Sequence, residues 1–210
     1  IAALCEAVGA DSHEVLHGMG LDTRIGNRFL EPGPGWGGSC FPKDAKALES
    51  IASNFGVGLP LITSAIASNE AAHKRVADRV TDALGGSLSG KTIAVLGLTF
   101  KANTDDTRES PAIAVIEHLV QGGAKVVAYD PMVTKYELAG LSLADSAVSA
   151  ASGADALVVL TEWPEFRTVN SAEVLRAMTG NVVVDTRRVL DQAKWQAAGA
   201  VFPNSSSRAV

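Results

Sequence analysis

The sequence predicts an α/β protein in two parts, a helical region with a glycine-rich loop over 1–84 and a parallel sheet with helices on both faces over 90–210. Three observations support this prediction. The stretch from Pro60 to about Leu84 is rich in alanine and other helix formers. The sequence GGSLSG at 85–90 has the composition of a linker. After it, short apolar runs alternate with helical stretches, as in strands joined by crossover helices.

The first part is predicted to consist of helices around one structured loop. Asp11 or Ser12 can cap the second helix, and Pro60 suits the first turn of the last one. The run EPGPGWGGSCFP holds four glycines and three prolines in twelve residues, which disfavours both helix and strand. The predicted elements are helices over 1–9, 11–17, 44–55 and 60–84, with the loop over 22–42.

The second part is predicted to form the sheet. The run TIAVL ends at Gly97, which is typical of a short buried strand. Ser110 and Pro111 supply a cap and a first-turn proline for a helix that ends at Gly122. The predicted strands are 92–96, 125–129, 156–160 and 181–184, with 199–202 as a possible last strand and a loose tail over 203–210.

Composition excludes several functional classes. The formal net charge is −5 without a basic run, so neither nucleic acid nor an anionic membrane surface is an expected partner. No stretch approaches the ~20 apolar residues that span a bilayer, and the N-terminus lacks a signal-peptide pattern. Two cysteines without a disulfide framework indicate a cytoplasmic protein. Because the chain starts without Met inside a helical pattern, we expect it to be a fragment.

Cys40 is the candidate nucleophile. Cys5 shares apolar helical spacing with its neighbours and is expected to be a buried thiol. Cys40 instead lies on the glycine-dense loop, where the backbone can approach a ligand. Lys43 and Asp44 follow closely; a cation lowers a thiol's pKa, and a carboxylate can orient water or move protons. Asp44 has a second reading as the cap of the next helix.

Several segments in a fixed order resemble one family. They are DTRIGNRFLEPGPGWGGSCFPKD, GKTIAVLGLTFKANTDDTRESPA, VVAYDP, DALVVLTEWPEF and VVVDTRR. Together they resemble the active-site segment and the UDP-binding domain of the UDP-glucose/GDP-mannose dehydrogenase family, over nearly the whole chain. The phrase GGSCFPKD is more similar to the UDP-glucose 6-dehydrogenase branch than to the UDP-N-acetylmannosamine branch, and the GDP-mannose enzymes stay the nearest alternative.

The resemblance implies an NAD-dependent oxidation of the C6 alcohol of UDP-glucose to UDP-glucuronate. Two hydrides pass to two NAD molecules in turn. Cys40 attacks the intermediate aldehyde to form a thiohemiacetal, which becomes a thioester that water hydrolyses. Asp44 corresponds to the family's catalytic aspartate. The resemblance also implies a Rossmann-like second domain and a homodimer built on the helix that Pro60 opens.

The resemblance assigns further residues to binding. Lys43 lies near the cofactor, and Arg108 is directed at the NAD phosphates unless it pairs with a neighbouring carboxylate. Arg24 reaches toward the sugar across the dimer interface, and Arg187 lies at the UDP site, although Thr186 replaces the family's usual glycine there. The remaining substrate residues are Phe29, Leu30, Glu31, Gly35, Trp36 and Gly37 on the loop, and Phe100 and Lys101 after the first strand.

Some functions remain open or are not expected. The turn after Gly97 lacks the second glycine of a dinucleotide fingerprint, so this domain is not expected to bind NAD alone. The family's NAD-binding domain precedes the matched region, so the 210 residues alone are expected to be inactive as a dehydrogenase. The four histidines show no ligand spacing, so no metal is predicted. A non-catalytic UDP-binding module and a thiol hydrolase are the alternatives.

Overall fold

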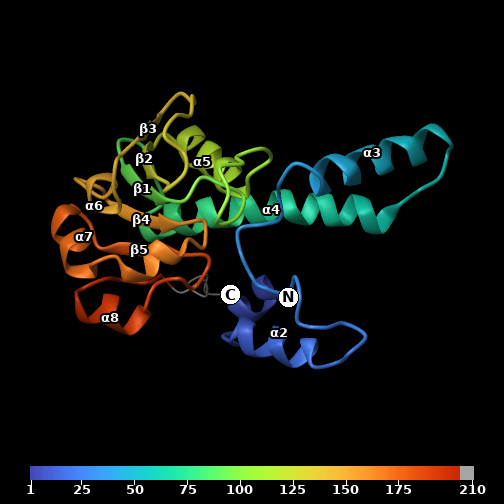
Figure 1. Ribbon diagram of the computed structural model, residues 1–210, viewed down its shortest axis with the longest axis horizontal. Coiled ribbons are helices and arrows are strands. Elements are labelled where there is room, and N and C mark those ends of the chain that lie inside the picture. The colour runs from blue at the N-terminus through green and yellow to red at the C-terminus, as the bar shows by residue number, and fades with distance from the viewer. Residues whose placement is uncertain (204–210) are drawn as a thin grey trace.

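The computed structural model describes residues 1–203, in a helical region and a sheet domain (Figure 1). Most of the tail that was expected to be loose lies outside these residues. The helical region contains α1 (Ala2–Val8), α2 (Ser12–Gly20), α3 (Phe41–Asn54) and α4 (Pro60–Ala83). Helix α3 and the first half of α4 form a hairpin that projects away from the rest of the molecule, which we call the arm (Figure 1).

The second part is a five-stranded sheet in which all strands are parallel. The strand order is β3-β2-β1-β4-β5, so the first strand is central and the chain winds outward from it in both directions. The elements are β1 (Thr92–Leu96), α5 (Pro111–Gln121), β2 (Lys125–Tyr129), β3 (Leu141–Leu143), α6 (Ala147–Ala150), β4 (Ala156–Val159), η1 (Pro164–Thr168), α7 (Ser171–Ala177), β5 (Val182–Asp185) and α8 (Gln192–Ala197).

Each face of the sheet has its own hydrophobic core. The C-terminal half of α4 and the apolar side of α5 pack on one face, where Val80 and Ile116 are fully buried. On the other face, Phe166 and Trp195 are buried with residues from α6 and α7. Strands covered on both faces are almost continuously apolar, which explains the runs TIAVL and ALVV. The α/β prediction, with helices on both faces, is therefore confirmed.

The main differences between predicted and observed elements are two helix bounds, one strand that was not predicted and one predicted strand that is not formed. Helix α3 begins at Phe41 rather than 44, because Pro42 fits a first turn whose N–H groups have no helical partner. Helix α2 continues beyond 17 to Gly20. Strand β3 was not predicted, since it has three residues and none is buried. The expected strand over 199–202 reduces to a bridge between Val201 and β5, because Gly199 has a φ of 106° and Pro203 lacks an N–H.

Among the described residues, none of the helices combines the length and the apolar character needed to cross a lipid bilayer.

Candidate active site

Cys40 lies at the N-terminus of α3 with its side chain exposed. It ends the segment 33–40, which we call the cysteine loop. The Ser39 Oγ lies 3.7 Å from the Cys40 Sγ. Cys40 is the N-cap residue of this helix, which is 14 residues long. Cys5, by contrast, is buried as predicted, so the two thiols occupy opposite environments.

Two cations lie near Cys40, and each is paired with a carboxylate. Lys43 forms an ion pair with Asp44, and Arg108 donates from Nε and Nη2 to Asp106 at 2.9 and 2.8 Å. The pKa of each cation lies above its ordinary value, first because of its carboxylate partner and further because of the negative charge that Cys40 can carry. Cys40 therefore shares one exposed region with Lys43, Asp44 and Arg108. The predicted alternative for Arg108, a carboxylate partner, is also realised.

The cysteine loop packs directly against the sheet domain through its glycines. The Gly38 amide donates to the Glu109 carbonyl at 3.4 Å. A Cβ on Gly37 would collide with that carbonyl and with Pro111, and one on Gly38 would press on the Phe100 ring. Both glycines are thus required by close packing, and Gly38, with a φ of 92°, also by its backbone conformation. The sequence argument anticipated close approach to a ligand, but did not identify Glu109 as the neighbouring residue.

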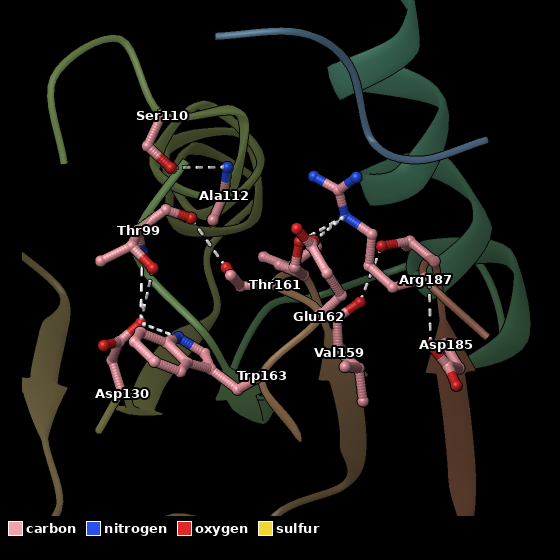
Figure 2. Close-up of polar contacts among 12 residues, drawn as sticks. Thr99, Ser110, Ala112, Asp130, Val159, Thr161, Glu162, Trp163, Asp185 and Arg187 are labelled. Atoms are coloured by element: carbon pink, nitrogen blue, oxygen red, sulfur yellow. Dashed lines mark hydrogen bonds and ion pairs between the residues drawn. The ribbon is translucent and has the colours of Figure 1, made fainter. Parts of the chain in front are cut away.

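Arg187 joins the other end of this loop to the sheet edge. It follows β5, and its Nε donates to the Leu160 carbonyl at 3.1 Å and lies 3.2 Å from Glu162 Oε2 (Figure 2). Burial lowers the pKa of Arg187, which the carboxylate of Glu162 opposes. A Cβ on Gly33 would collide with the guanidinium, so Arg187 lies against the cysteine loop. Two regions predicted to act together, the loop and the DTRR segment, are in contact.

Asp130 closes the turn after β1. It directly follows β2, is buried, and its Oδ2 accepts from the Leu98 amide at 2.8 Å, the Thr99 amide at 3.2 Å and the Trp163 indole at 3.1 Å (Figure 2). In dinucleotide-binding domains an acidic residue binds the ribose. Here this oxygen already accepts four protein donors, because the Thr99 hydroxyl also donates to it, at 3.3 Å. Sequence reasoning missed Asp130, although its place after a predicted strand was an available signal.

Four of the predicted substrate residues lie together on the exposed segment before the cysteine loop. Arg24 pairs with Asp22 at 2.6 Å, and Phe29 is 101% exposed. Leu30 and Glu31 border a cavity of about 200 Å³ on α2. Within residues 1–203, none of the four forms a hydrogen bond with Cys40. Their roles in substrate binding therefore stay predictions.

Three other predicted residues lie close to the cysteine loop or within it. Lys101 extends over the Phe100 ring, with its Nζ 5.3 Å from the centroid. Gly35 has a φ of 143° and packs on α4, where Asn69 contacts it. The Trp36 main chain is hydrogen bonded to the Asn69 side chain. Asn69 was not identified from the sequence, because an asparagine inside a long helix has no distinctive pattern.

Two larger cavities adjoin the cysteine loop. One of about 400 Å³ lies between α1, α2 and the end of β5, and includes Gly33 and Arg188. The other, of about 290 Å³, lies under Trp36 and includes His73, Glu70 and Glu117. Within residues 1–203, no group of three or more His, Cys, Asp or Glu side chains is arranged to hold a metal ion.

Fold and site together define a Rossmann-like α/β protein in which a helical region presents a cysteine loop to the edge of a parallel sheet. Two models of one family match the chain: the central domain of the UDP-glucose/GDP-mannose dehydrogenase family over residues 1–71, and its UDP-binding domain over 94–192. The chain belongs to the UDP-glucose/GDP-mannose dehydrogenase family.

Similar proteins agree with this assignment. UDP-glucose 6-dehydrogenase of Rhizobium meliloti is 46% identical over 192 residues, covering 90% of this chain and 44% of that protein. UDP-glucose 6-dehydrogenase TuaD of Bacillus subtilis is 40% identical over 214 residues, covering 100% and 46%. The structure of a UDP-glucose dehydrogenase from Pyrobaculum islandicum matches with a TM-score of 0.81 at 30% identity, covering 98% and 46%. The chain thus spans less than half the length of these relatives.

Proposed function

We propose that this chain is the cysteine-bearing and UDP-sugar-binding part of an NAD-dependent UDP-glucose 6-dehydrogenase. The observation that carries the proposal is the position of Cys40: exposed, at the N-terminus of α3, near two cations, on a loop packed against the sheet domain. A packed structural thiol would be buried, as Cys5 is. The names of the relatives in the family supply the substrate.

The proposed chemistry on the chain's own residues begins once the C6 alcohol has become an aldehyde. The Cys40 thiolate adds to the aldehyde carbon, a C–S bond forms, and the carbonyl oxygen takes up a proton to give a thiohemiacetal. Loss of a hydride and of that proton gives a thioester. Water then attacks the thioester, the C–S bond breaks, and the carboxylate leaves while the thiolate is restored. In this proposal Asp44, which pairs with Lys43 in the first turn of α3, accepts the proton of the attacking water.

NAD supplies the hydride acceptor for both oxidations. Lys43 and Arg108 fit a role in holding its phosphates, because both are exposed cations close to Cys40. The turn after β1 does not fit a dinucleotide, since Asp130 Oδ2 already accepts protein donors. We expect the chain on its own to bind a UDP-sugar without reducing NAD.

Substrate binding is proposed at the edge of the sheet next to the cysteine loop. Arg187 and Lys101 supply positive charge for the diphosphate, and Phe100 and Trp36 supply aromatic surface. The exposed apolar residues of the arm favour a homodimer, in which Arg24 would reach the partner's sugar. The two cysteines, both free, suit a reducing cytoplasm.

Alkylation of the chain tests the proposal. We expect iodoacetamide to modify Cys40 at least about tenfold faster than Cys5, and UDP-glucose to slow that reaction, because substrate covers the sulfur. Peptide mass spectrometry measures both thiols in one sample, so Cys5 is an internal control. Protection by GDP-mannose in place of UDP-glucose would favour that branch of the family. A Cys40 as slow as Cys5, or unaffected by any nucleotide sugar, would favour a non-catalytic module.

A further inference from the structure

Asn69 connects the middle of α4 to the cysteine loop by two hydrogen bonds. Its Oδ1 accepts from the Trp36 amide at 2.8 Å, and its Nδ2 donates to the Trp36 carbonyl at 3.0 Å. The residues are 33 positions apart, so the pair is a tertiary contact. An asparagine side chain that satisfies both main-chain groups of one residue acts like a neighbouring strand, and fixes the backbone in position and in direction.

Contacts on both sides of Trp36 extend this constraint to the nucleophile. Gly35 packs so closely on Asn69 that a Cβ there would collide with its side chain. The Trp36 ring meets the Phe41 ring edge-on, with centroids 4.7 Å apart. Phe41 directly follows Cys40 and opens α3. The path from Asn69 through Trp36 to Phe41 therefore ends next to Cys40, the residue that carries the sulfur.

We infer that Asn69 is a positioning residue, which holds the cysteine loop so that Cys40 meets a nucleotide sugar bound at the sheet edge. The inference rests on the proposed function and adds to it a residue that touches neither substrate nor cofactor. Residues 33–40 have no other side-chain amide bonded to their main chain among the hydrogen bonds of the described part of the chain. The loop's contacts with the sheet domain include the close packing of its glycines and one long hydrogen bond, from the Gly38 amide to the Glu109 carbonyl.

The experiment compares three variants of the chain by UDP-glucose protection of Cys40 against iodoacetamide. Asn69→Ala removes both bonds, and we expect about tenfold weaker protection. Ser68→Ala, on the same helix and exposed, is the matched control and should behave as the wild type. Asn69→Asp keeps the shape and the acceptor but faces the Trp36 carbonyl with an anion at neutral pH. Its protection should improve as pH falls from about 8 to about 5, because a protonated carboxyl can donate again.

The outcomes separate this inference from the proposed function. If wild-type Cys40 is unprotected by any nucleotide sugar, the proposed function fails whatever Asn69 does. If wild type is protected and Asn69→Ala is protected equally, the positioning role is overturned. His73, Glu70 and Glu117 are other ionisable groups of the cavity under Trp36. The pH response of Asn69→Asp is therefore compared with that of Asn69→Ala, which retains these groups but lacks the new carboxyl. Equal pH responses of these two variants would also overturn the inference. Unfolding temperatures of all variants identify any that lose the fold.

Discussion

His73 is a single side chain whose protonation bears on the cysteine loop. Its Nε2 is buried without a hydrogen-bond partner among the described residues, and it lies against Gly35. Burial lowers the pKa of His73 below 6.5; Glu70 raises it and His118 lowers it further, by smaller amounts. A proton on this nitrogen would add a buried donor without an acceptor, which costs free energy.

We therefore predict that acidification destabilises the fold through His73. The unfolded imidazole takes up a proton near 6.5, whereas the folded one resists, so its contribution is present above that pH and is lost as pH falls through the folded pKa. NMR titration of the His73 ring, compared with the urea-unfolded chain, measures the shift. His73→Gln should flatten the pH dependence of the unfolding free energy in this range. A folded pKa at or above the unfolded value would contradict the prediction.

At the residue scale, the sequence predicted the reactive and charged side chains better than the residues that hold them in position. Cys40 and Arg187 stand out because their types and surroundings suit thiol and phosphate chemistry. Asn69 and Asp130 matter through hydrogen bonds to partners more than 30 positions away, which exist only after folding. Neither residue type nor spacing predicts such a partner. For Arg108 the sequence left two roles open, binding of a phosphate and pairing with a neighbouring carboxylate. The structure has the pairing, with Asp106.

At the scale of elements, the turn after β1 depends on a glycine for two separate reasons. Gly97 has a φ of 98°, and a Cβ there would collide with Thr161. Thr161 in turn donates to the Thr99 carbonyl at 2.8 Å, which ties the ends of β4 and β1 together (Figure 2). Both strain and crowding therefore oppose any side chain at this position.

Gly97→Ala is predicted to destabilise the protein by about 3 kcal/mol, measured by urea unfolding. Gly86→Ala is the matched control, because Gly86 has a similar φ of 92° but open space around it. Gly86→Ala should lower the free energy of unfolding by about 1 kcal/mol, because it introduces the backbone strain without the collision. Equal losses at the two positions would show that crowding by Thr161 contributes nothing.

The apolar strands could be predicted from the sequence, including β5 at one edge of the sheet, whereas β3 at the other edge could not. Strands β1 and β4 are covered on both faces, so burial imposes continuous apolar runs on them. Strand β3 lies at the edge with exposed or half-buried residues, and its polar Ser142 breaks the run. The start of α3 was misplaced because proline suits a loop and a first helical turn equally well. Local composition does not separate these two possibilities.

At the scale of the whole molecule, the arm carries large apolar side chains that are exposed to solvent. Phe55 is 81% exposed and Leu61 is 85% exposed, near the tip where α3 turns into α4. Surface of this kind usually meets a partner. A second copy of the chain is the proposed partner, since identical arms could cover each other's apolar side.

Leu61→Glu is predicted to shift a homodimer toward monomer, because a carboxylate would be buried between the arms. Sedimentation velocity over a concentration series measures the change. Met132→Glu provides a control, as Met132 is also exposed but lies on the sheet domain. A wild-type chain that sediments as a monomer at every concentration would exclude the dimer.

Helix α4 belongs to both parts of the molecule at once. Its first half forms the arm and carries Asn69, while Val76 and Val80 of its second half are buried against the sheet. This continuous helix, about 36 Å long, therefore fixes the orientation of the arm relative to the sheet domain. One residue inserted between Asn69 and Val76 would rotate the arm by about 100° relative to the sheet. The bonds between Asn69 and Trp36 would be kept within the rotated part, whereas Gly37 and Gly38 would lose their contacts with the sheet domain. The sulfur would then be turned away from the strand ends.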